Sequence, residues 1–388
     1  AVHIGKAFFP ASTPLGSLLL SVAVFGVGFV TRPIGGILIG AYADRVGRKA
    51  ALLLTIVLIT IGTLGLALTP SYDSIGIWAP VIVVLARLVQ GLALGGEIGP
   101  SSALLVELAP KNKRGFWGSW QLASQGLAML VAGLIGLTMS YLLTVEELQG
   151  WGWRVPFAIG VFLIPVAIYL RKTMPETLGH HEKLDTKTQA QQVKSHTWII
   201  FISVLIVMGG TISTYLNTYM TTYSITTLKL SPKIGMFATI AVGLSTFVFS
   251  LIGGWLSDQY GRKLVMLIPR VISAIIVVPC FLYLVDQKDL TSLIMVSAVL
   301  SGLTAISGAA SLVAIPELLP QRIRALGMSI AYAVGVALFG GSTQFVVTWL
   351  LQVTENPVSP AWYVVGASVL TTIAMLIAPE TKHNELKN

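Results

Sequence analysis

Two stretches far apart in the chain share one pattern: GGILIGAYADRVGRK from Gly35 to Lys49 and GGWLSDQYGRK from Gly253 to Lys263. Each follows a long apolar run and precedes another. A glycine in such a turn can adopt backbone angles that are closed to other residues, and the charges hold the turn at the lipid surface. The stretch therefore predicts a tight basic turn between two membrane helices, and its second copy predicts a duplicated helical bundle.

A second pair of segments repeats in the same order. VELAPKNKRG at 106–115 matches PELLPQRIRA at 316–325, which aligns Glu107 with Glu317. The two halves are therefore expected to be parallel repeats, related by an axis along the membrane normal. We expect both glutamates to pair with loop arginines rather than with substrate. The candidate conformational-gating residues are Asp44, Gly47, Arg48, Asp258, Gly261, Arg262, Glu107 and Glu317.

The composition indicates a polytopic membrane protein. The 388 residues are 54% hydrophobic and only 11% charged, and the mean hydropathy is +0.81. A soluble domain needs more polar surface. The formal charge of +9 does not indicate nucleic acid, because the basic residues gather in alternate loops. The single Cys280 lies in an apolar run, so no disulfide framework is expected.

About eleven complete membrane spans are expected, since each needs about 20 apolar residues. Ala1–Phe9 is too short to span and is expected to be the end of a helix whose start is absent. That preceding helix would bring the count to about twelve. The expected spans are 15–40, 50–69, 78–108, 116–142, 152–171, 196–223, 234–256, 265–285, 291–316, 326–351 and 360–377.

Basic residues predict the orientation and the domain boundaries. About seventeen Lys and Arg lie in one set of loops against roughly five on the opposite side, so the basic loops and both termini of the full-length protein are expected in the cytoplasm. We divide the chain into an N-terminal bundle at 1–172, a cytoplasmic linker at 173–195 and a C-terminal bundle at 196–388. His180 and His181 in the linker have no ligand cluster nearby, so no metal site is expected.

Charged residues within spans are candidates for function, because intramembrane charge is costly. Arg32 precedes Asp44 by twelve residues, about 18 Å along a helix, and a guanidinium there suits a carboxylate. Arg87, Gln90, Glu97 and Ser101 fall within about 80° of one helix face, which predicts a polar stripe on a water-filled cavity. Glu97 is a candidate for protonation, and the alternative is a buried structural ion pair.

Other polar positions in the spans carry weaker signals. Arg270 follows Lys263 by only seven residues, so it is expected to reach the cytoplasmic surface. Gln121 and Gln125 are one turn apart, and their amides suit a substrate rich in hydroxyl and carboxylate groups. The hydroxyl stripe Thr211, Tyr215, Thr218 and Thr222 is expected to join helices slightly more than to line a cavity.

Nothing in the sequence indicates an enzyme or a nucleotide-driven pump. No phosphate loop, metal-ligand spacing or nucleophile triad stands out, so energy is expected to come from an ion gradient.

Several motifs resemble one transporter family. The repeated turn is similar to the signature loop of the major facilitator superfamily. ARLVQG at 86–91 resembles the fourth-helix motif of its proton-coupled members, in which the arginine helps to transfer protons. GGE at 95–97 and WGWRVPF at 151–157 resemble the metabolite:proton symporter family. The segments SWQLASQ and ALFGG, together with AVFGVGF and RPIGG, most resemble its citrate and tricarballylate branch, although Arg270 is unusual for that branch.

The resemblance implies an all-α major facilitator fold of two six-helix bundles, with the first helix largely missing from this chain. It implies a secondary active transporter of the bacterial inner membrane that imports a small polycarboxylate with protons by alternating access. Arg32, Arg87, Gln90, Gln121 and Gln125 would bind the substrate, and Glu97 with Arg87 would couple protons. A monomer without cofactor is expected. The alternatives are a symporter of betaine or proline, 2-oxoglutarate or shikimate, and a transporter-like receptor.

Overall fold

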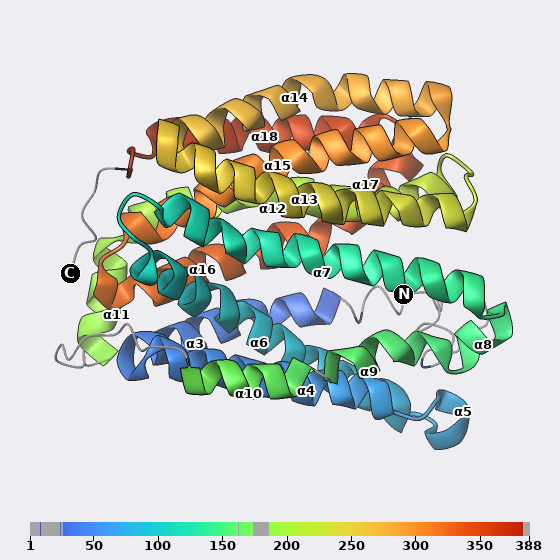
Figure 1. The fold of residues 1–388 in the computed structure, drawn as a ribbon, viewed down its shortest axis with the longest axis horizontal. Helices are drawn as coiled ribbons and strands as arrows, with labels where there is room; N and C mark the ends of the chain where they lie inside the picture. Colours follow the sequence, from blue (N-terminus) through green and yellow to red (C-terminus); the bar gives the residue numbers. More distant parts are fainter. Residues whose placement is uncertain (1–7, 9–23, 25, 162, 174–185, 383–388) are drawn as a thin grey trace.

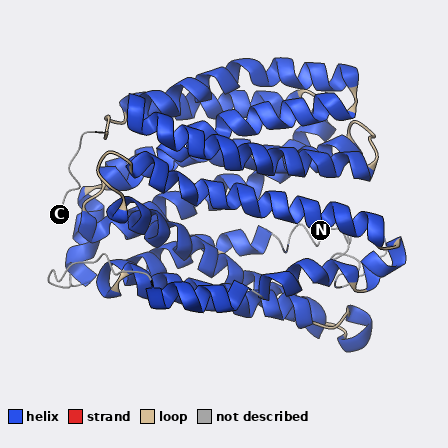
Figure 2. Cartoon of the chain, in the orientation of Figure 1, coloured by secondary structure: helices blue, strands red, loops and turns tan. Residues whose placement is uncertain are grey.

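The computed structural model describes residues 8, 24, 26–161, 163–173 and 186–382, and most of them lie in helices (Figure 2). In this part of the chain 10 helices are long and apolar enough to cross a membrane. Large apolar side chains are exposed on them, such as Ile61 at 55%, Ile275 at 68% and Leu370 at 54%. Extended apolar surface of this kind is a membrane-facing surface. The chain is an all-α, multi-pass membrane protein, as predicted.

The helices follow one another with short connections. The first half of the described chain contains α3 (Arg32–Val46), α4 (Arg48–Leu68), α5 (Tyr72–Ile75), α6 (Trp78–Leu108), α7 (Arg114–Leu142), α8 (Val145–Gly150), the 3₁₀ turn Gly152–Arg154, α9 (Val155–Val161) and α10 (Leu163–Thr173). After it come α11 (Thr186–Ser195), α12 (Thr197–Thr226), α13 (Pro232–Tyr260), α14 (Arg262–Gln287), α15 (Leu290–Leu318), the 3₁₀ turn Gln321–Ile323, α16 (Arg324–Gly335), the π-helix Val336–Gly340, α17 (Gly341–Thr354) and α18 (Ser359–Ile377).

The two repeated turns are shorter than predicted, because each is a single glycine. Gly47 separates α3 from α4 with φ 131°, and Gly261 separates α13 from α14 with φ 98°. Both angles lie in the region that favours glycine, which confirms the predicted role of these residues. Asp44 and Arg48 therefore lie on helix ends one turn apart, not in a loop. The same geometry recurs at Asp258 and Arg262.

Helices from the two halves pack against each other along the middle of the molecule. In Figure 1, α7 runs beside α13, and α16 lies between α3 and α6 on one side and α12 on the other. Small residues permit the close approach of α7 to α13. A Cβ atom added at Gly115 would lie 2.4 Å from the carbonyl oxygen of Gly254, and one added at Gly254 would lie 2.6 Å from that of Gly115. This interface holds two distant parts of the sequence together.

Two details differ from the expectations, and some expected features lie outside the described residues. The span expected at 326–351 contains the π-helix Val336–Gly340 between α16 and α17. The pattern of apolar residues does not distinguish a π-helix from an α-helix, so the sequence did not predict it. The linker, expected as a loop, contains the helix α11, since Thr186–Ser195 has few helix breakers. His180 and His181 lie outside the described residues, as does most of the first part of the span expected at 15–40.

Candidate functional site: a sealed end and a central cavity

Asp44 joins the two halves of the chain at the end of the molecule that carries the glycine turns, here called the basic end (left in Figure 1). Its carboxylate accepts hydrogen bonds from the backbone N–H groups of Ala325 at 3.2 Å and Leu326 at 2.8 Å, in the first turn of α16. It also pairs with Arg48 on α4. A carboxylate at a helix N-terminus satisfies orphan N–H groups and complements the helix dipole. Asp44 therefore caps a helix of the opposite half.

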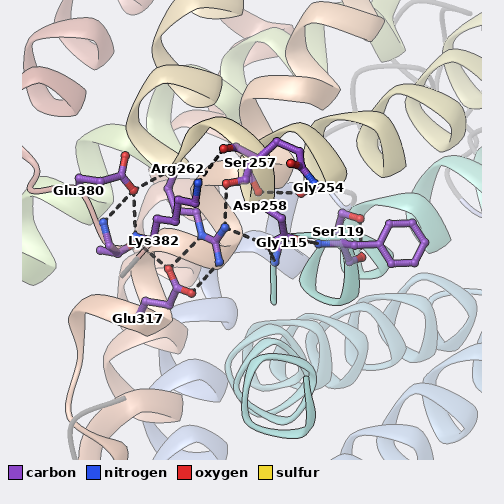
Figure 3. A network of polar contacts seen from close by, with 12 residues as sticks. Gly115, Ser119, Gly254, Ser257, Asp258, Arg262, Glu317, Glu380 and Lys382 are labelled. Atoms are coloured by element: carbon purple, nitrogen blue, oxygen red, sulfur yellow. Dashed lines mark hydrogen bonds and ion pairs between the residues drawn. The ribbon is translucent and has the colours of Figure 1, made fainter. Parts of the chain in front are cut away.

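Asp258 repeats this arrangement in the reverse direction. Its two carboxylate oxygens accept from the N–H groups of Gly115 at 2.7 Å and Phe116 at 2.8 Å, in the first turn of α7, and one oxygen pairs with Arg262 at 2.9 Å (Figure 3). Each half thus supplies an aspartate that caps a helix of the other half. The repeated sequence stretch is a repeated contact between the halves.

The two glutamates complete the charged clusters. Glu107 accepts from Arg48 at 3.2 Å and from Arg324 at 2.9 Å, so it too connects the halves. Glu317 binds Arg262 at 3.0 and 3.2 Å, and it accepts from the Thr381 hydroxyl at 2.6 Å. Both glutamates pair with arginines, as predicted, but these arginines are the first residues of helices rather than loop residues. The three arginines are almost completely buried, which is favourable only because they are paired.

Glu380 adds a contact that the sequence did not indicate. Its carboxylate accepts from the N–H groups of Arg262 at 2.8 Å and Lys263 at 2.9 Å, and so caps α14 (Figure 3). Partial burial opposes its ionisation, but these N–H groups, with those of Thr381 and Lys382, outweigh that effect and lower the pKa of Glu380 below its ordinary value. The only available signal was a Pro-Glu-Thr triplet that occurs at 175–177 and again at 379–381.

A cavity of about 300 Å³ lies deeper between the halves. It borders α7, α12, α14, α15, α16 and the start of the π-helix. Its lining is mostly apolar and hydroxyl-bearing, with Arg270 as the one charged side chain among the lining residues. The lining residues are Leu122, Gln125, Met129, Ile206, Val207, Gly210, Thr211, Thr214, Tyr215, Thr218, Arg270, Thr304, Gly308, Ser311, Leu312, Tyr332 and Val336.

The structure brings part of the predicted site to this cavity. Gln125 lines it directly. Arg32 borders it through Tyr215, to whose hydroxyl it donates at 3.3 Å, and its guanidinium stacks on Phe29 at 4.0 Å. Tyr332 lies on the same cavity wall as Gln125, whereas Glu97 is not among the residues that line the cavity. Two of the residues predicted separately, Arg32 on α3 and Gln125 on α7, therefore meet at this cavity.

Other predicted residues lie elsewhere. Arg87 donates to the Gln90 side chain at 3.1 Å, and Gln90 donates to the Thr63 hydroxyl at 3.1 Å, which ties α6 to α4. Gln121 is buried on α7. These three predicted residues are not among those that line the 300 Å³ cavity. The hydroxyl of Ser101 returns to the backbone of its own helix, so the predicted stripe on α6 is not one continuous lining.

One expectation about a side chain was wrong, and another held only in part. Arg270 does not reach the surface: it is 1% exposed, donates to the Gly209 carbonyl and the Ser213 hydroxyl, and borders the cavity. The separation of seven residues between Lys263 and Arg270 predicted how far Arg270 lies from the membrane surface. It did not predict the direction of the side chain, which is set by packing against α12. The hydroxyl stripe was expected to join helices slightly more than to line a cavity: Tyr215 does join α12 to α3 through Arg32, but Thr211, Tyr215 and Thr218 all line the cavity. In the described part of the chain no group of three or more His, Cys, Asp or Glu forms a metal-binding cluster.

Comparisons with known proteins agree with this architecture. The family described as "Sugar (and other) transporter" matches residues 6–194 and 178–388. The citrate-proton symporter of Salmonella typhi is 37% identical over 97% of this chain and 88% of its own length. The proline/betaine transporter of Escherichia coli K12 is 30% identical over 100% of this chain and 80% of its own length. The solved structure of the proton:xylose symporter XylE, bound to 6-bromo-6-deoxy-D-glucose, superposes with a TM-score of 0.80 at 21% identity, covering 99% of this chain and 92% of XylE.

The matched family and these curated relatives are transporters, and the fold of membrane-spanning helices agrees with them, so the chain is a membrane transporter rather than an enzyme. The chain belongs to the Sugar (and other) transporter family, within the major facilitator superfamily, and over nearly its whole length its sequence is similar to citrate-proton symporters.

Proposed function

We propose that this chain imports a small polycarboxylate of the citrate class together with protons, across a bacterial inner membrane. The similarity to two citrate-proton symporters, at 37% and 33% identity over nearly the whole chain, supports the substrate class. The observation that carries the proposal is the cavity, whose lining residues include an arginine and no acidic side chain. Such a lining favours an anion.

The charged clusters are proposed to be the gate of this transporter. Asp44 and Asp258 each hold a helix of the opposite half, so both contacts have to break when the basic end opens. In this proposal the clusters close the basic end while the cavity opens to the other side. We assign the structure, in which both clusters are formed, to the state with the basic end closed. Alternating access is an exchange between this state and one with the clusters separated.

The predicted site residues are assigned roles on this basis. Arg32 would meet a substrate carboxylate when its bond to Tyr215 opens, and Gln125 would hydrogen-bond the substrate from α7. Glu97 on α6 would carry the coupled proton. Arg87 is proposed to help Glu97 in coupling. Gln90 and Gln121 complete the set proposed to bind substrate.

The basic end is proposed to face the cytoplasm. The protein is proposed to act as a monomer of two bundles, the N-terminal one at 1–172 and the C-terminal one at 196–388. A cysteine at Lys113 should then be protected from an impermeant thiol reagent in intact cells, and one at Asp73 should be labelled. The reverse pattern would contradict the orientation.

A zwitterion such as betaine or proline is the second candidate, favoured by the 30% identical proline/betaine transporter. Competition for uptake separates the two. Purified protein in proteoliposomes should accumulate labelled citrate, and unlabelled tricarballylate should compete better than glycine betaine. Accumulation of betaine with no effect of either tricarboxylate would refute the proposed substrate class.

A further inference from the structure

Arg270 differs from the other arginines that the protein buries. Four arginines are among the largest fully buried side chains: Arg48, Arg262, Arg270 and Arg324. Three of them pair with Glu107 or Glu317. Within the described chain no carboxylate pairs with Arg270. A buried charge without a counter-ion is strongly unfavourable, so a position that keeps one is a candidate binding site.

The hydrogen bonds of Arg270 leave one side of the guanidinium available. Nη1 donates to the Gly209 carbonyl at 3.1 Å and to the Ser213 hydroxyl at 2.8 Å, and these contacts hold the side chain against α12. Nε has no hydrogen-bond partner in the described part of the protein. Nη2 donates no hydrogen bond to any described residue. The fixed Nη1 orients the guanidinium, and Nη2 retains its capacity to bind a ligand.

A glycine keeps Nη2 open to the cavity. Gly210 borders the cavity beside Arg270, and a Cβ atom added there would lie 3.8 Å from Nη2 as its nearest neighbour. This distance is ordinary van der Waals contact, so we expect a branched side chain at position 210 to cover Nη2. Thr211 and Thr214 border the cavity on the same helix and offer hydroxyl groups. A carboxylate at Nη2 would therefore have donors and acceptors beside it.

We propose that Arg270 is the carboxylate anchor of the cavity. A substrate carboxylate binds Nη2 and supplies the negative charge that the buried arginine lacks, while hydroxyl groups of the substrate face the threonines of α12. This assignment rests on the proposed transport of an organic acid and identifies the group that selects it. A zwitterion would satisfy Arg270 but leave its cationic part in a cavity whose lining has no carboxylate.

Equilibrium binding to the purified full chain tests the assignment, with citrate, tricarballylate, 2-oxoglutarate and glycine betaine as probes. Removing one partner of a buried charge pair should weaken binding of the preferred acid at least about 30-fold in Arg270→Gln. Arg270→Lys, which keeps the charge, should lose less. Arg154→Gln is the matched control, because Arg154 also lies in a membrane segment but donates to the Ala67, Thr69 and Gly150 carbonyls, away from the cavity.

A second variant separates binding from structure. Gly210→Val leaves the charge and the α12 contacts in place but covers Nη2, so it should lose acid binding at an unchanged melting temperature. Wild-type affinity in Arg270→Gln or in Gly210→Val would overturn the assignment, and so would a wild-type protein that binds none of the acids. Because binding needs no gradient, uptake of citrate without protons would refute the proposed symport and leave Arg270 as the anchor.

Discussion

Replacing Asp258 with asparagine should open the basic end. The Asp258 carboxylate holds the N–H groups of Gly115 and Phe116 at 2.7 and 2.8 Å, and both bonds join the two halves. In the proposed gate, they exist only while this end is closed. Asparagine keeps one oxygen that can accept a hydrogen bond, but it removes the charge. Its NH₂ group would face the second backbone N–H group, and two donors cannot form a hydrogen bond with each other.

The expected shift follows from these contacts. A hydrogen bond to a charged group contributes about 1.5–3 kcal/mol, and Asp258→Asn loses one such bond and weakens the other. The closed state should therefore lose about 3 kcal/mol relative to the open state, which changes their ratio roughly 150-fold. Only the closed state contains these bonds, so the change acts on the conformational equilibrium.

Electron–electron double resonance measures this shift. Nitroxides at Asn112 and Gln259, two exposed positions on opposite halves, report the separation at the basic end in a Cys280→Ser background. Asp258→Asn should add a population at longer distance. Asp289→Asn is the matched control, because Asp289 caps its own helix through Ser292 and joins no other element. Coinciding distance distributions for Asp258→Asn and its parent would refute the proposed gate.

Three further predictions concern single positions. Gly261→Ala should lower stability by about 1–3 kcal/mol in thermal unfolding, since φ is 98° and the new Cβ would lie 2.6 Å from Glu380, whereas Gly150→Ala, with open space around it, should be neutral. The pKa of Glu380 is lowered in the folded protein, so its ionised form stabilises the fold fully above its ordinary pKa of 4.5, and this stabilisation disappears as pH falls through the lower folded value. The difference in melting temperature between wild type and Glu380→Gln should therefore disappear below the folded pKa. A difference that persists in acid would contradict this. Glu97→Gln should abolish gradient-driven accumulation and spare exchange of labelled for unlabelled substrate, and accumulation with wild-type pH dependence would make Glu97 structural.

The sequence predicted the helices and the charged turns because both are local patterns. Apolar runs of sufficient length define spans, and the repeat of Asp44 and Arg48 at Asp258 and Arg262 identified the turns. The partners of the aspartates could not be predicted in this way. The first turns of α16 and α7 lie in the opposite halves, and no periodicity within one helix specifies how it meets another.

The cavity was predictable only in part for the same reason. Gln125 was placed on it by residue chemistry, whereas Arg270 was assigned to the surface from its distance along the chain. Depth along a helix is a property of one segment, but the direction of a side chain depends on its neighbours. The carbonyl of Gly209 and the hydroxyl of Ser213 fix Arg270 inward, and both belong to another helix.

Proton movement driven by an organic acid tests the central claim most directly. Proteoliposomes that contain the purified protein and a trapped pH indicator are given an inward gradient of citrate, with no initial pH difference. The account predicts acidification of the lumen that requires citrate, is absent in Glu97→Gln and is strongly reduced in Arg270→Gln. Citrate entry without any acidification, or acidification by glycine betaine alone, would contradict it.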